Sequence, residues 1–172
     1  MRKKMFRFCI LLSFLCVIAL SLASLHALGY RVNRSASLPG LVYQITPIGE
    51  FSDIKRGDCV LIDLTLFSNP VIEQGVRRGY VNKFEPMMKR IGAVPGDSVL
   101  LKGNRLFVNG GAVEMRVASF DSYGGKLSAW TTPLILSSDY YWLVSDPVRG
   151  FDSRYFGPLT RRVFTHKAVP IF

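Results

Sequence analysis

Hydrophobic residues are arranged in two different ways along this chain, and the arrangement changes near residue 30. Residues 8–28 contain no Asp, Glu, Lys or Arg, and this run is long enough to cross a bilayer as a helix. After residue 34 the chain consists of short runs of β-branched and aromatic residues, separated by Gly, Pro, Asn and Asp. The pattern predicts one apolar N-terminal helix followed by a mainly β domain, built as a compact coiled sheet or half-open barrel.

The β-like runs divide the second part of the chain. We expect strands at 41–46, 59–64, 87–94, 98–101, 105–108, 140–145 and 162–171. Turn signals at 102–104 and 109–110 predict successive hairpins. Residues 65–86 are expected to form a loop or a short helix, and residues 111–139 to be irregular. The predicted organisation is therefore a basic tip with an anchor at 1–30 and one domain at 31–172, with a small cap-like region at about 103–139.

The N-terminal segment determines where the domain is delivered. Arg2, Lys3, Lys4 and Arg7 precede the apolar run, and a basic tip stays on the cytoplasmic side of a membrane. A cleavable signal peptide is the alternative, because residues 21–23 (Ser-Leu-Ala) resemble a cleavage site, but its apolar core is usually only about 7–15 residues long. In either case the domain is exported. The expected location is a bacterial inner membrane, with the domain on the periplasmic side.

Charge and cysteine content exclude several classes of function. The net charge is +10, of which the tip supplies +4, and the remaining basic residues are scattered, so we expect no nucleic-acid binding. A basic face towards anionic lipid headgroups accounts better for the excess. The three cysteines, Cys9, Cys16 and Cys59, show neither a disulfide framework nor metal-ligand spacing, so no metal or cofactor is expected. His26 and His166 lie beside no nucleophile block, which argues against a histidine triad.

Ser37 and Lys89 are the candidate nucleophile and base. A serine hydroxyl needs a neighbouring base, and a lysine can serve as that base only when burial keeps it neutral. As a strand, 87–94 places Lys89 on one face with Met87, Ile91 and Ala93, which is the apolar face. Taken alone, such a lysine is typical of a solvated edge strand. The sequence therefore predicts a serine–lysine dyad only when both blocks are considered together.

The segment around Ser37 has two interpretations. By itself it is an ordinary linker that leaves the membrane. However, Pro39 and Gly40 predict a sharp turn that can present the hydroxyl and aim the Ser37 amide at an oxyanion. The hydroxyl of Ser35 is a candidate second oxyanion donor.

A third block, 150–158, is expected to support Lys89 without reacting itself. Asp152 and Arg154 are close enough in sequence to form an ion pair, and Arg90 is a further candidate partner. A structural ion-pair corner is the alternative interpretation of this block.

Together the blocks resemble the signal peptidase I family, the membrane-anchored serine–lysine leader peptidases. The matching blocks are Ser-Ala-Ser-Leu-Pro at 35–39, Gly-Asp-Cys-Val at 57–60, Lys-Arg-Ile-Gly-Ala-Val-Pro-Gly-Asp at 89–97 and Asp-Ser-Arg-Tyr-Phe-Gly at 152–157. Residues 37–43 are similar to the conjugal-transfer subgroup, the TraF-type peptidases. The resemblance implies a signal-peptidase-like coiled sheet, Ser37 as nucleophile, Lys89 as general base and Ser35 as an oxyanion donor.

Two blocks of the chain depart from the family pattern. Ser145-Asp146-Pro147 stands where signal peptidases usually carry Gly-Asp-Asn, and Gly150 stands where they often carry a serine that orients the lysine. This leaves Ser153 or a backbone carbonyl to support Lys89.

The expected function is a membrane-anchored serine endopeptidase that processes exported precursors. The TraF resemblance narrows the expected client to a pilin precursor for conjugative type IV secretion, with hydrolysis and cyclisation both open. A general signal peptidase and a non-catalytic assembly factor of the secretion apparatus are the alternatives. A self-cleaving LexA-like repressor would need a DNA-binding head where this chain has its apolar segment.

Overall fold

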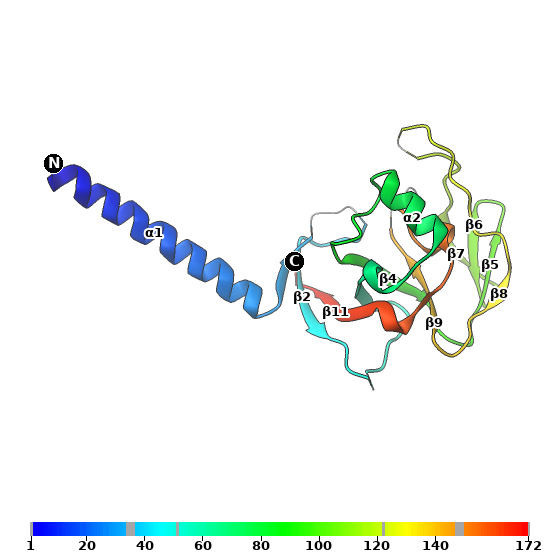
Figure 1. Ribbon diagram of the computed structural model, residues 1–172. Helices are drawn as coiled ribbons and strands as arrows, with labels where there is room; N and C mark the ends of the chain where they lie inside the picture. Colours follow the sequence, from blue (N-terminus) through cyan, green and yellow to red (C-terminus); the bar gives the residue numbers. More distant parts are fainter. Residues whose placement is uncertain (1, 34–36, 51, 122, 147–149, 172) are drawn as a thin grey trace.

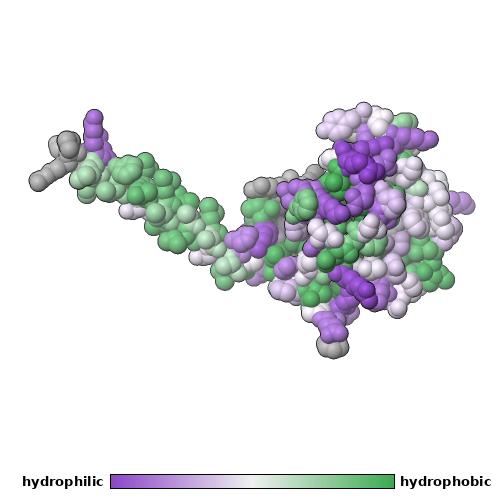
Figure 2. Space-filling view, viewed as in Figure 1, coloured by the Kyte–Doolittle hydropathy of each residue, from purple (hydrophilic) through white to green (hydrophobic). Residues whose placement is uncertain are grey.

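A long N-terminal helix leads directly into a β domain (Figure 1). The structure is a computed structural model that describes residues 2–33, 37–50, 52–121, 123–146 and 150–171. Helix α1 spans Arg2–Ala27, and its stretch Lys4–Ala27 is long and apolar enough to cross a membrane. Its hydrophobic surface is uncovered by the rest of the protein (Figure 2). This helix therefore adds nothing to the core of the domain, and its surface suits a lipid environment.

The junction between helix and domain is short and hydrogen-bonded. Strand β1 (Tyr30–Val32) begins after only Leu28 and Gly29. Arg31 Nη1 donates to the carbonyl of His26 at 2.7 Å, and the Ile45 N–H donates to the carbonyl of Gly29 at 2.9 Å. The domain therefore starts close to the C-terminal end of the helix, with two residues between α1 and β1.

The main sheet has seven strands in the order β1-β2-β11-β3-β4-β9-β10, and neighbouring strands are antiparallel. Besides β1, its strands are β2 (Val42–Pro47), β3 (Cys59–Ile62), β4 (Met87–Ala93), β9 (Tyr140–Val144), β10 (Leu159–Thr160) and β11 (Phe164–Pro170). The C-terminal strand β11 lies between β2 and β3, which ties the two ends of the domain together.

A smaller sheet lies at the side of the domain away from α1 (Figure 1). Its order is β7-β6-β5-β8, with β5 at Ser98–Lys102, β6 at Arg105–Val108, β7 at Gly111–Arg116 and β8 at Leu134–Ile135. Trp142 and Val144 of β9 pack with Val99 and Leu106 of this sheet in one core cluster. Strand β9 is therefore shared between the main sheet and the core beneath the second one.

Short helices cover the main core. Helix α2 spans Pro70–Arg77 and is capped by Asn69, whose Oδ1 accepts from the N–H groups of Val71 and Ile72 at 2.8 and 3.3 Å. Pro70 occupies the first helical position. Helix α3 (Ser153–Phe156) and the 3₁₀ turns Leu64–Leu66 and Arg161–Val163 complete the described elements.

The mainly β class with an apolar N-terminal helix is confirmed, and three local expectations need correction. The strand expected to reach residue 64 ends at Ile62, because Asp63 caps a 3₁₀ turn through the N–H of Thr65. The last strand begins at Phe164 instead of 162, since the preceding residues form the other 3₁₀ turn. The range 111–139 contains β7 and β8, because the 109–110 turn returns the chain along β6. The division into anchor, domain and cap stays a prediction.

Candidate active site

Lys89 lies in the middle of β4 and points into the protein. Burial alternates along the strand, and Lys89, Ile91 and Ala93 are its buried residues. Val60 of β3 stands opposite Lys89 in the antiparallel pair. Only 3% of Lys89 is exposed. The sequence-predicted apolar face of this strand is therefore the face on which the lysine lies.

The glycine that follows in this block has a packing role. A Cβ at Gly92 would lie 2.9 Å from Cγ1 of Val144, closer than real side chains approach. The β4–β9 pairing shifts its register between Ile91 and Ala93 at this point. Because Gly92 has no side chain, β9 can pack closely against β4 three residues after Lys89.

Ser37 lies in a turn fixed by its neighbours. Leu38 is buried in a cluster with Tyr43, and the Tyr43 hydroxyl donates to the carbonyl of Pro39. Gly40 has φ of +95°, a conformation that glycine adopts without strain. The predicted turn after the serine is thus held by one buried side chain and one buried hydroxyl.

The structure brings the two predicted residues together. Nζ of Lys89 lies 3.4 Å from Oγ of Ser37, across 52 positions of sequence. Burial lowers the pKa of Lys89 from 10.5 to about 8, with the Asp152 carboxylate acting in the opposite direction and Arg154 adding to the lowering. A useful fraction of Lys89 is therefore neutral near pH 8, and its free lone pair can accept the serine proton.

Asp152 and Arg154 form the predicted ion pair, and both are fully buried. Nη2 of Arg154 donates to Oδ2 of Asp152 at 2.6 Å, and Nε donates to Oδ1 at 2.8 Å. The guanidinium also donates to the carbonyls of Arg116, Ser145 and Gly150 at 2.6, 3.2 and 3.2 Å. This bidentate pair is a rigid charged unit beneath the lysine, and it joins α3 to the ends of β7 and β9.

The residues that follow β9 connect this ion pair to the nucleophile turn. The N–H and hydroxyl of Ser145 both donate to Oδ2 of Asp152, at 2.7 and 2.6 Å. The next residue, Asp146, donates its backbone N–H to the carbonyl of Ser37 at 2.9 Å. Two consecutive residues therefore link the support of the candidate base to the loop of the candidate nucleophile.

The other predicted site residues are placed differently. Arg90 pairs with Asp146 at 3.0 Å and not with Asp152, because alternation along β4 directs it to the face opposite Lys89. Oγ of Ser153 accepts from the N–H of Leu143 at 2.9 Å, so it holds the strand beside β4. Ser35 lies outside the described residues, so the predicted oxyanion pair with Ser37 stays a prediction.

Sequence reasoning missed three contributors to the site. Asn33 donates through Nδ2 to the carbonyls of Leu38 and Gly40, at 3.0 Å each, and so clamps the turn after Ser37. Ser145 and Asp146 were noted only as part of a block that departs from the family pattern, and neither was expected to hold the site. For Asn33 the only signal is a side chain suited to turns, four residues before the serine.

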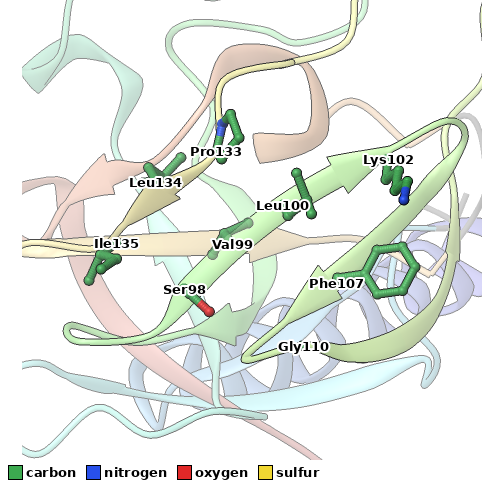
Figure 3. Close-up of a pocket in the computed structure, with 9 residues that line it drawn as sticks. All are labelled: Ser98, Val99, Leu100, Lys102, Phe107, Gly110, Pro133, Leu134 and Ile135. Carbon is green, nitrogen blue, oxygen red and sulfur yellow. The ribbon is translucent and has the colours of Figure 1, made fainter.

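The described part of the chain also contains a surface hollow of about 650 Å³ on the second sheet (Figure 3). Residues of β5, β6 and β8 line it, among them Val99, Leu100, Phe107, Leu134 and Ile135. Neither Ser37 nor Lys89 is among its lining residues, so this hollow and the candidate dyad are separate features.

A serine hydroxyl thus faces a buried lysine amine in a mainly β domain that follows a helix long and apolar enough to cross a membrane. The sequence model of the signal peptidase family, peptidase S26, matches residues 5–172, and the chain belongs to this family.

Similar proteins carry names from plasmid transfer. The chain is 27% identical over 150 residues to a conjugal transfer protein TraF of Agrobacterium fabrum, covering 84% of this chain and 82% of that protein. It is 30% identical over 148 residues to a plasmid transfer protein TraF of Escherichia coli, covering 79% and 78%. A signal peptidase I of known structure from Enterococcus faecalis aligns with 66% of this chain and 94% of that chain, with a TM-score of 0.40 and 20% identity.

Proposed function

We propose that this protein is a membrane-anchored serine endopeptidase in which Ser37 is the nucleophile and Lys89 the general base. The observation that carries the proposal is the 3.4 Å approach of Nζ of Lys89 to Oγ of Ser37, made by a lysine that is 3% exposed. Burial is what a lysine needs to act as a base near neutral pH.

The proposed reaction begins at Ser37. Oγ of Ser37 attacks the scissile carbonyl carbon while Nζ of Lys89 takes the hydroxyl proton, and the Ser37 amide and Ser35 hydroxyl stabilise the oxyanion. Lys89 then returns the proton to the leaving amine, and an ester-linked acyl-enzyme remains. Water, activated by the same lysine, hydrolyses the ester and regenerates Ser37.

The client is a precursor that reaches the outer face of the membrane. The basic tip at the start of α1 favours a cytoplasmic N-terminus and a periplasmic domain in a bacterial inner membrane. The domain begins at the end of α1, so its dyad works close to the lipid surface. We propose that the substrate binds as an added strand, with shallow pockets that select small side chains.

The relatives named for conjugal and plasmid transfer narrow the proposed client to a pilin precursor for conjugative type IV secretion. In that case the client's own N-terminal amine can replace water at the acyl-enzyme, which forms an amide and yields a cyclic pilin. The second candidate function is a general signal peptidase, favoured by the match to the family model along residues 5–172. A non-catalytic assembly factor is the alternative from another class.

Co-expression with two precursors tests the proposal. The full chain, Ser37→Ala and Lys89→Ala are each expressed with a candidate pilin precursor and with a generic secreted precursor, and mass spectrometry reports cleavage and any loss of water. Ser128→Ala and Lys102→Ala are matched controls, because both side chains are exposed. Cleavage of the pilin alone, lost in both dyad variants, supports the narrow role.

Three other outcomes separate the alternatives. Cleavage of both precursors assigns the general signal peptidase function. Cleavage that persists in Ser37→Ala and Lys89→Ala shows that the dyad does not carry the reaction, and the absence of any cleavage by the full chain favours the assembly factor.

A further inference from the structure

The proposed reaction leaves a charged lysine inside the protein. After Lys89 takes the Ser37 proton, its ammonium group has three N–H donors, whereas among the described residues Nζ has one hydrogen-bond partner, Ser37 Oγ. An ammonium group without acceptors in a buried site is costly. The fold must therefore supply a further acceptor near Nζ during the reaction.

The register of β4 against β9 indicates that Ser145, the residue after β9, lies next to Lys89. Arg90 stands opposite Val144, and Ile91 stands opposite Leu143, in the antiparallel pairing of β4 with β9. Continued by one position, this register sets Lys89 opposite Ser145. Residues opposite one another in an antiparallel pair have side chains on the same face. Ser145 is fully buried, so its side chain lies inside the protein, as that of Lys89 does.

The Ser145 hydroxyl is prepared to accept. It donates its proton to Oδ2 of Asp152 at 2.6 Å, so the hydroxyl dipole directs its oxygen lone pairs away from the carboxylate. The charged groups that act on Lys89 are Asp152 and Arg154. The uncharged Val60 stands opposite Lys89 on β3, and the uncharged Ser145 follows β9 at the position inferred to face it.

We propose that Ser145 is a positioning residue for the base: its hydroxyl accepts a hydrogen bond from the Lys89 ammonium and links that charge to the Asp152 carboxylate. In this chain of contacts a proton moves only from Ser37 to Lys89, and Ser145 keeps its own proton on the side of Asp152. The inference rests on the proposed function of the dyad. It assigns a role to the Ser145 hydroxyl, which takes no part in the reaction of Ser37 and Lys89 described above.

An NMR titration tests this contact without requiring peptidase activity. The full chain is labelled with ¹³C at Cε of lysine in detergent micelles, and the Lys89 signal is assigned by its loss in Lys89→Arg. A hydrogen bond to a charged group contributes about 1.5–3 kcal/mol, so Ser145→Ala should lower the Lys89 titration midpoint by about one pH unit or more, a tenfold change. Ser145→Thr should keep the wild-type midpoint because it retains a hydroxyl.

Ser153→Ala is the matched control. Ser153→Ala also removes a fully buried hydroxyl, but that hydroxyl accepts from the backbone N–H of Leu143. The Lys89 titration midpoint should therefore not move in this variant, although the protein should unfold at a lower temperature. An unchanged midpoint in Ser145→Ala, or a shift in Ser153→Ala alone, overturns the proposal. If Ser145→Ala does not fold, Ser145→Cys gives the same comparison, since a thiol is a weak acceptor of similar size.

Cleavage rates test whether the Ser145–Lys89 hydrogen bond affects the reaction. Precursor cleavage by Ser145→Ala should fall about tenfold at pH 9, above the acid limb, because the Lys89 ammonium formed in the transition state loses an acceptor. The acid limb itself should move to lower pH, in the same direction as the NMR midpoint. Equal losses of activity and stability with an unmoved limb would show a purely structural role. Failure of the peptidase proposal appears separately, as cleavage that does not depend on Ser37.

Discussion

The backbone N–H of Asp146 donates a 2.9 Å hydrogen bond to the carbonyl oxygen of Ser37. Because Arg90 holds the Asp146 side chain at 3.0 Å, the residue after the candidate base helps to fix the loop of the candidate nucleophile. The dyad is thus held from both sides of β4: Lys89 points inward above the Asp152–Arg154 pair, and Arg90 points outward to Asp146.

Arg90→Met should reduce precursor cleavage about tenfold, because small displacements of a nucleophile are costly in rate. The Arg90–Asp146 pair is about one-third exposed, so its loss should change the free energy of unfolding by less than about 1 kcal/mol. Lys83→Met is the matched control, since it breaks an ion pair of similar length and exposure with Glu73, on α2. Equal activity in the two variants, measured at matched folded concentration, would contradict the positioning role.

The sequence could predict the burial of Lys89 and the Asp152–Arg154 pair, and it could not predict what joins them. Alternation along 87–94 places the lysine on the apolar face, and a spacing of two residues brings the carboxylate to the guanidinium. The contacts of Ser145 and Asp146 depend on how β9 pairs with β4, and that register contains a shift between Ile91 and Ala93. Local patterns do not specify such a register.

Some expectations failed because neighbours override local preference. Strand β7 has weak β signals of its own, but the turn at 109–110 and pairing with β6 make it a strand. Arg90 was a further candidate partner for Asp152, but strand alternation and the loop after β9 bring it to Asp146 instead.

The activity should depend on pH through Lys89. With a pKa of about 8, only about a tenth of this lysine is neutral at pH 7, and each further unit of acidification should lower cleavage about tenfold. Cleavage rates from pH 5 to pH 9, in detergent micelles, should therefore show one acid limb with a midpoint near 8. Lys89→Arg should be inactive at every pH, because arginine stays protonated in proteins. A flat profile between pH 6 and pH 8 would require a different base.

Lys89→Met should stabilise the protein while abolishing cleavage. A pKa lowered from 10.5 to about 8 means that burying the charged lysine costs about 3 kcal/mol at pH 7, and methionine removes that cost at similar volume. Urea unfolding of the full chain in micelles should give a higher midpoint for the variant at pH 7.

The pH dependence of stability tests the same assignment. Below about pH 8 Lys89 is protonated in both the folded and the unfolded states, so its penalty is constant and largest there. Between about 8 and 10.5 the unfolded state binds more protons, so the free energy of unfolding should rise with pH. The difference between wild type and Lys89→Met should shrink over that range, and a constant difference would show that the lysine is not the group responsible.

Asn33→Asp tests whether cleavage requires the hydrogen bonds from Asn33 to the turn after Ser37. Nδ2 of Asn33 donates to the carbonyls of Leu38 and Gly40, and a carboxylate oxygen at that place would repel both. Precursor cleavage should fall tenfold or more, while the acid limb stays near pH 8 because the surroundings of Lys89 are unchanged. Asn104→Asp, at an exposed hairpin turn, makes the same chemical change away from the site and should cleave normally. A displaced acid limb in Asn33→Asp would mean that the substitution acts on the pKa of Lys89. The lost hydrogen bonds to the turn after Ser37 would then not be the cause of the lower cleavage rate.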